Sequence, residues 1–189
     1  MAAPSSSETV SIVTDAAMAP TPLAGAPELR APRPFLGAAR TGLLLGVCSA
    51  ASLTVFMLML RHFVPLEHWG ASAAGSLGHL SSMALFVFAA ITTPLFETVI
   101  GQLIPIELAR YFGAKALVCV LTGGAVFGLG HFVNGGVVHG IAAFLAGSIF
   151  SYGYVRSRHA GAAAAYLAAA TAHGVHNAVL LFIVSRFVD

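Results

Sequence analysis

The run TGLLLGVCSAASLTVFMLML, residues 41–60, decides the fold class of this chain. It is apolar almost throughout and contains no Asp, Glu, Lys or Arg. The hydrocarbon core of a bilayer is about 30 Å thick, and an α-helix needs roughly 20 mostly apolar residues to cross it. The run therefore predicts a transmembrane helix.

The rest of the chain has the same character. Of its 189 residues 58% are hydrophobic and only 8% are charged, and its mean hydropathy is +0.88. A soluble domain carries about 25% charged residues. Four more apolar segments follow the first, at about 79–108, 116–132, 137–155 and 162–187, and Asn134-Gly135-Gly136 predicts a turn between the middle two. We expect an all-α, polytopic transmembrane helix bundle of about five helices.

Residues 1–34 differ from everything that follows. They are rich in Ala, Pro, Ser and Thr and have no helical apolar stripe, so they bury too little to offset their ordering entropy. No basic stretch followed by an apolar run marks a signal peptide near the start. We expect a disordered tail over 1–34 and a transmembrane domain over 35–189. The net charge of +2 and the scattered basic residues exclude a nucleic-acid partner.

The basic residues predict the orientation of the helices, because loops on the cytoplasmic side of a membrane are enriched in Lys and Arg. With the N-terminus in the cytoplasm, only Arg61 and Arg186 lie outside. Seven basic residues then lie inside: Arg30, Arg33, Arg40, Arg110, Lys115, Arg156 and Arg158. We therefore predict a cytoplasmic N-terminus.

Four polar side chains interrupt the apolar segments at membrane depth: Glu97, His131, His173 and Asn177. An ionised side chain at that depth costs on the order of 3 kcal/mol or more. His173 and Asn177 are four residues apart and so share one helix face. Because three segments each contribute a titratable group, we expect these groups to converge around a cavity that holds water.

Two further histidines, His139 and His176, also fall inside apolar segments. A single intramembrane histidine is more often a hydrogen-bonding strut between helices than part of a site, and we interpret each of these two in that way. His176 lies three residues after His173, about 300° around the helix, and so points in another direction.

Three short motifs at these residues resemble those of the CAAX protease and bacteriocin-processing (CPBP) family of intramembrane proteases, which includes the type II CAAX prenyl endopeptidases. The family carries EExxxR, FxxxH and HxxxN on separate helices. The second motif reads FGLGH, Phe127 to His131, and the third reads HGVHN, His173 to Asn177. The first motif reads ETVIGQ and keeps Glu97, with Thr98 and Gln102 in place of the second Glu and the Arg. The resemblance covers about 80–187 and places the chain on a divergent branch.

This resemblance implies a hydrolase, an intramembrane endopeptidase that cleaves a membrane-associated or lipidated protein. As it implies, Glu97 deprotonates a water molecule and His131 positions that water. His173 and Asn177 then stabilise the oxyanion. Thr98, Gln102 and Phe127 are supporting residues of the motifs.

The same residues also permit a metal-dependent mechanism. Two histidines and one glutamate form a known catalytic zinc set, which here would be Glu97, His131 and His173. The sequence has no HExxH motif, and members of the family have been described both as metalloendopeptidases and as glutamate proteases. We favour a metal-free mechanism with no cofactor and keep a divalent metal such as zinc as the alternative.

Two other functions compete with the protease hypothesis. The loss of the second Glu and the Arg, at Thr98 and Gln102, favours a catalytically inactive membrane protein that binds a peptide or partner. A relay through Glu97 and the histidines would instead make a proton or ion carrier. The bacterial members of the family imply a multi-pass protein of the bacterial inner (plasma) membrane, surrounded by lipid. No residue indicates which protein is its substrate.

Overall fold

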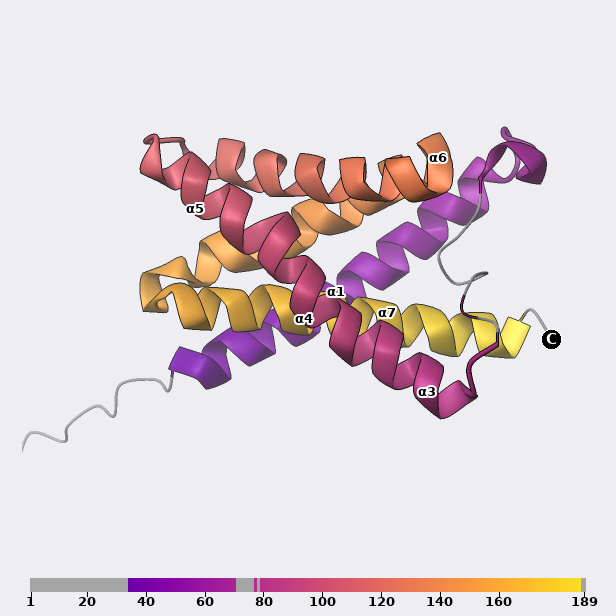
Figure 1. The fold of residues 1–189 in the computed structure, drawn as a ribbon, viewed down its shortest axis with the longest axis horizontal. Coiled ribbons are helices and arrows are strands. Elements are labelled where there is room, and N and C mark those ends of the chain that lie inside the picture. Colours follow the sequence, from indigo (N-terminus) through magenta and orange to yellow (C-terminus); the bar gives the residue numbers. More distant parts are fainter. Residues whose placement is uncertain (1–33, 71–76, 78, 188–189) are drawn as a thin grey trace, which may run out of the picture. The chain divides into compact units, whose positions relative to one another are not determined.

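A computed structural model describes residues 34–70, 77 and 79–187, with side chains described as far as residue 183. Every regular element among these residues is a helix (Figure 1). In chain order they are α1 (Pro34–Leu60), the 3-10 turn η1 (Leu66–His68), α3 (Ser82–Val87), the π-turn η2 (Phe88–Thr92), α4 (Thr93–Thr98), the π-turn η3 (Val99–Leu103), α5 (Ile104–Tyr111), α6 (Ala116–Ser157), the 3-10 turn η4 (Arg158–Ala160) and α7 (Ala162–Phe187). The predicted tail, residues 1–34, lies outside the described residues except for Pro34.

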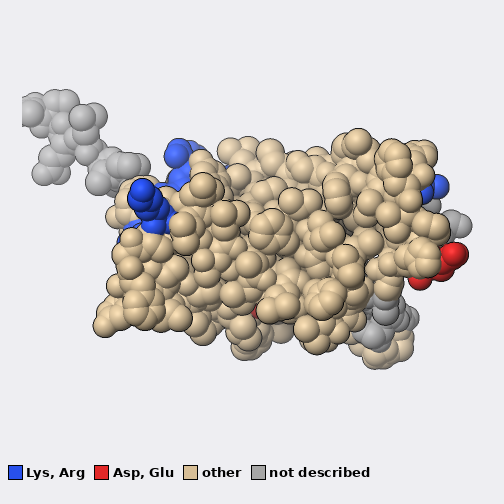
Figure 2. All heavy atoms as spheres, turned by 90° about the horizontal axis from the view of Figure 1, so that it is seen from above, with Lys and Arg blue, Asp and Glu red and all other residues tan. Residues whose placement is uncertain are grey.

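Four helical stretches are long and apolar enough to cross a membrane: Pro34–Leu60, Ser82–Tyr111, Ala116–Ala160 and Ala162–Ile183. On the face shown in Figure 2, charged side chains lie toward two ends, and the band between the ends is almost free of charge. Large apolar side chains such as Phe96 and Leu129 are exposed, which suits contact with lipid. The prediction of an all-α helix bundle is confirmed, and the chain is an integral membrane protein. The cytoplasmic position of the N-terminus stays a prediction.

Helix α6 reverses its direction at Gly136, whose φ of 82° and ψ of −174° are not helical. Glycine adopts such a positive φ readily because it has no Cβ. The two arms, residues 116–135 and 137–157, pack side by side, since a methyl group added at Gly128 would lie 2.8 Å from Phe144 Cβ. The arms coincide with the third and fourth predicted segments, and the turn falls at the predicted place. The number of membrane crossings, predicted as five, stays a prediction.

Two prolines shape the helical stretch from Ser82 to Tyr111. A proline has no backbone N–H to donate, and its ring clashes with the carbonyl four residues earlier. A π-turn ends two residues before each proline, η2 before Pro94 and η3 before Pro105. Such a wider turn accommodates the missing hydrogen bond, and π-turns are frequent at functional sites. The short helix α4 between them carries Glu97.

Helix α7 contacts both α1 and the stretch from α3 to α5. Gly42 and Gly46 bring α1 close, since a methyl group added at Gly46 would lie 2.7 Å from Val175 Cβ. Gly174 allows a similarly close approach of α7 to η2, because a methyl group added there would lie 2.7 Å from the carbonyl oxygen of Ala90. Small residues allow this close approach of helices within a membrane. The backbone around His173 is therefore held between two neighbouring helices.

Candidate active site

Glu97 meets two histidines from other helices. Its Oε2 lies 3.7 Å from His173 Nε2 and 3.9 Å from His131 Nε2. These distances are longer than a direct hydrogen bond but fit a bridging water, which would lie about 2.8 Å from each atom. The three titratable groups that were expected to converge are thus brought together.

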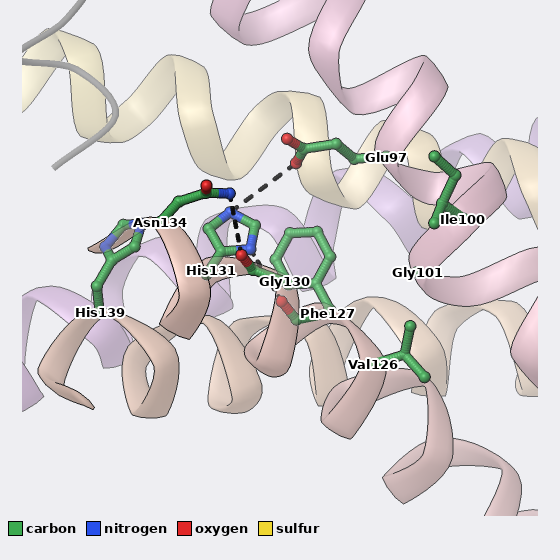
Figure 3. A pocket seen from close by; sticks show the side chains of 9 residues that line it. All are labelled: Glu97, Ile100, Gly101, Val126, Phe127, Gly130, His131, Asn134 and His139. Atoms are coloured by element: carbon green, nitrogen blue, oxygen red, sulfur yellow. Dashed lines mark hydrogen bonds and ion pairs between the residues drawn. The ribbon is translucent and has the colours of Figure 1, made fainter. Parts of the chain in front are cut away.

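A cavity of about 200 Å³ opens beside Glu97 and His131 (Figure 3). Its walls come from α4, η3 and both arms of α6, through Glu97, Ile100, Gly101, Val126, Phe127, Gly130, His131, Asn134 and His139. A largely apolar lining with a few polar groups is usual for binding sites. Glu97 and His131 line this cavity, and His173, which is not among its lining residues, faces Glu97 from close by; the three together make it the candidate active site.

His131 has a defined orientation on the first arm of α6. Its Nδ1 lies 2.9 Å from the carbonyl oxygen of Phe127. Because a carbonyl oxygen only accepts hydrogen bonds, Nδ1 carries the proton in this contact. In the neutral ring, Nε2 then bears a lone pair, and this is the nitrogen that faces Glu97.

His173 is almost completely enclosed, with 3% of its side chain exposed. Phe150 stacks on its ring at a centroid distance of 4.9 Å and an interplanar angle of 17°. Its Nδ1 is buried and has no hydrogen-bond partner among the described residues, whereas its Nε2 faces Glu97. Buried N–H groups without a partner are rarer than buried acceptors without one, so the proton of the neutral ring belongs on Nε2. His176 packs its ring against Phe150 and does not line the cavity.

Phe127 separates the two imidazoles. Its ring centroid lies 4.4 Å from that of His131 and 5.1 Å from that of His173. Two glycines leave room for its ring, since a methyl group added at either Gly101 or Gly147 would lie 2.8 Å from a Phe127 side-chain carbon. The phenylalanine of the FxxxH motif thus sets the spacing of the two histidines.

The amide of Asn177 is directed elsewhere. Its Nδ2 donates a hydrogen bond of 2.8 Å to the carbonyl oxygen of Ala89 in η2. In the π-turn η2 the N–H of Thr93 bonds to the carbonyl oxygen of Phe88, so in the same register residue 94 would donate to Ala89, and Pro94 has no N–H to do so. Asn177 supplies the missing donor. Its role in stabilising an oxyanion stays a prediction, and like His173 it is not among the residues that line the cavity.

The comparison with known families agrees with this geometry. A family model described as type II CAAX prenyl endopeptidase Rce1-like matches residues 79–179, which is more than half of the chain. The chain belongs to this Rce1-like family. The matched region includes Glu97, His131, His173 and Asn177. No curated protein and no solved structure matched the chain.

The two departures from the first motif of this Rce1-like chain lie away from the cavity. Thr98 and Gln102 are both 0% exposed, and none of their side-chain polar atoms has a partner among the described residues. A buried acid without its cation, or a cation without its acid, would be strongly destabilising. Replacing both by neutral residues avoids this penalty, and neither Thr98 nor Gln102 is among the residues that line the cavity.

Sequence reasoning missed an ion pair and two cavity residues of the Rce1-like core. Arg158 donates two hydrogen bonds to Glu107, one from Nε to Oε1 at 2.7 Å and one from Nη2 to Oε2 at 3.1 Å. Tyr154 Oη also donates to Oε1, at 3.0 Å. Tyr154 and Arg158 share a helix face, but their acid partner lies about fifty residues away in sequence. Asn134 and His139 reach the cavity only because α6 reverses between them.

The candidate zinc ligands lie farther apart than the ligands of a bound zinc ion. Within the part of the chain that the structure describes, no group of three or more His, Cys, Asp or Glu side chains could hold a metal ion. Ligands at about 2.0–2.1 Å from a tetrahedral zinc are roughly 3.4 Å apart. Glu97 Oε2 lies farther than that from both His131 and His173 Nε2. The three side chains do not fit a zinc site, and the mechanism below uses no metal.

Proposed function

We propose that this chain is an intramembrane endopeptidase that hydrolyses a peptide bond of a membrane-associated or lipidated protein, using water activated by Glu97. One observation carries the proposal: a single carboxylate oxygen lies within 3.9 Å of two imidazole Nε2 atoms beside a cavity between membrane-spanning helices. Membership of a protease family supports the same class of reaction.

In this mechanism Glu97 takes a proton from a bound water, and the water oxygen attacks the carbonyl carbon of the scissile bond. The carbonyl oxygen becomes an oxyanion in the tetrahedral intermediate. When the C–N bond breaks, Glu97 returns its proton to the leaving amine. General base catalysis of this kind contributes typically about 10²–10⁴-fold to the rate.

The two histidines have different tasks because they face Glu97 in opposite tautomers. The Nε2 lone pair of His131 accepts a hydrogen bond from the water and holds it beside Glu97. The Nε2–H of His173 donates to the oxyanion, where one well-placed donor is worth about 10²–10³-fold in kcat. We propose Asn177 as a second donor to the oxyanion. One N–H of its amide bonds to the carbonyl of Ala89, and the other N–H is the one that would donate.

We further propose that the chain is a multi-pass protein of the bacterial inner (plasma) membrane with a cytoplasmic N-terminus. The excess of Lys and Arg on one side supports this orientation. The substrate class is a peptide presented by the bilayer, since the cavity lies among membrane-spanning helices.

The proposal is tested with purified protein in liposomes and a farnesylated CAAX peptide, because the family's description names a CAAX prenyl endopeptidase. Mass spectrometry detects the released peptide. We expect cleavage by the wild type and a loss of at least about 10²-fold in kcat for Glu97→Gln, His131→Ala and His173→Ala. Glu67→Gln and His62→Ala, two exposed positions after α1, serve as matched controls and retain full activity.

Chelation separates the two mechanisms. We expect EDTA to leave the rate unchanged, whereas a rate lost with EDTA and restored by zinc would contradict the metal-free mechanism. Cleavage by Glu97→Gln at the wild-type rate would overturn the proposal. A wild type that binds the peptide without cleaving it would favour the non-catalytic binding protein, and pH-driven proton flux in empty liposomes would favour the carrier.

A further inference from the structure

The cavity has two chemically different ends (Figure 3). Ile100, Gly101 and Val126 line one end with apolar atoms. Asn134 and His139 line the other end with polar groups. Glu97 and His131 stand between the two ends, so a substrate bound along the cavity would meet both ends on either side of its reacting bond.

His139 has no part in the mechanism above, and its surroundings do not fit a structural strut. Its ring lies on the second arm of α6, with its centroid 5.1 Å from that of His131. It is half-buried, and neither ring nitrogen has a hydrogen-bond partner among the described residues. A histidine that bridges helices would hydrogen-bond to one of them. The ring of His139 lines the cavity instead, and a neutral imidazole has one N–H, which no hydrogen bond to the described residues uses.

Asn134 adds a second donor at the same end. Its Nδ2 donates one hydrogen bond of 3.1 Å to the carbonyl oxygen of Gly130. An amide NH₂ has two hydrogens, so one remains for a ligand. The polar end therefore combines two donors and has no carboxylate of its own, since Glu97 is the single acid among the lining residues.

We propose that Asn134 and His139 form a subsite that binds a carboxylate of the substrate next to the scissile bond, while Ile100 and Val126 contact an apolar group on the other side. A carboxylate accepts hydrogen bonds from several donors at once and binds neutral donors more strongly than a carbonyl does. The cavity is smaller than the roughly 300–1,000 Å³ of drug-sized pockets, so it holds a short stretch of peptide. This carboxylate is either the C-terminus of the peptide or an acidic side chain near it.

The subsite rests on the proposed function, and a binding measurement separates the two. We use Glu97→Gln protein, which retains the cavity, and three farnesylated CAAX peptides. One ends in a free carboxylate, one in an amide, and one in an amide preceded by Asp. We expect the free acid to bind at least about tenfold more tightly than the plain amide, as for a hydrogen bond to a charged group. Binding of the Asp peptide shows whether a side-chain carboxylate is accepted too.

A second substitution identifies the donor. Adding His139→Leu to Glu97→Gln should abolish the preference for the acid while leaving the affinity for the plain amide within about twofold, and Asn134→Leu should reduce the preference less. Equal binding of acid and amide peptides by the parent protein would overturn the subsite. An equal loss of affinity for all three peptides in the His139→Leu variant would also overturn it, because that result indicates a packing role.

Cleavage kinetics then test the same subsite in the active protein. The ratio of kcat/KM for acid and amide peptides should fall about tenfold in His139→Leu, through KM rather than kcat. If no peptide is cleaved in a Glu97-dependent manner, the proposed function fails while the binding result still decides the subsite.

Discussion

Asn177 Nδ2 donates a 2.8 Å hydrogen bond to the carbonyl oxygen of Ala89, which Pro94 deprives of a helical donor. The third motif is thereby joined to η2, the π-turn that precedes the helix α4 carrying Glu97. The backbone of Gly174 also approaches the carbonyl of Ala90, so α7 packs closely against η2 at two successive residues. The π-turn η2 is thus held in place by a helix far away in sequence.

Asn177→Leu should therefore destabilise the protein by about 1–3 kcal/mol, since a buried carbonyl loses its donor. The loss should be smaller in a Pro94→Ala background, where residue 94 regains a backbone N–H for η2. Thermal unfolding of the four proteins in one detergent gives this coupling. Equal destabilisation in both backgrounds would show that Asn177 does not act through the proline. Activity that is absent in both backgrounds would favour its role at the oxyanion.

Gly101→Ala should lower activity through Phe127. The added methyl group would lie 2.8 Å from Phe127 Cδ2, so the ring must move between the two imidazoles. We expect kcat to fall about 10- to 100-fold, with a loss of about 1–3 kcal/mol in stability from overpacking. Combining it with Phe127→Leu should recover part of the stability. Gly37→Ala is the control, because its methyl group would meet no atom within 4 Å; equal activity of the two glycine variants would contradict the role given to Phe127.

Thr98 and Gln102 replace the second Glu and the Arg of the first motif, and substitutions at these two positions test why both are neutral here. Thr98→Glu alone and Gln102→Arg alone should each destabilise the protein by about 3–5 kcal/mol, because each places an unpaired charge at a fully buried position. The double substitution should recover much of that loss by restoring the family's acid and cation together. Unfolding of all four proteins measures the coupling. Strictly additive losses would indicate that the two side chains do not share one site.

Much of the candidate site could be predicted from the chain because intramembrane polar groups are costly and therefore rare. Glu97, His131 and His173 stood out in apolar segments, and the structure brings all three together. The turn at Gly136 could also be predicted, since a Gly pair interrupts an apolar run. In each of these cases the residue type and its place within an apolar segment were enough for the prediction.

The remaining features depend on which helices become neighbours, and helical periodicity does not contain that information. It placed Asn177 on the same face as His173 but did not reveal that its partner would be Ala89. The sequence favoured the interpretation of His139 as a strut between helices, because its position beside His131 depends on the reversal of α6. The ion pair of Glu107 and Arg158 joins a residue that the sequence indicated only as part of the basic side, Arg158, to one that no sequence pattern singled out, Glu107.

The topology prediction can be tested by labelling cysteines in intact cells, after Cys48 and Cys119 have been replaced by Ala. If α6 crosses the membrane twice, His62→Cys and Val133→Cys should both react with a membrane-impermeant maleimide from outside. Lys115→Cys and His159→Cys should react only after the membrane is permeabilised, because they lie next to the basic loops. Inverting all four results would reverse the orientation and leave five crossings. Labelling of Val133→Cys from the same side as Lys115→Cys would instead mean that the arms of α6 enter and leave the membrane on one side, and that the chain crosses it only three times.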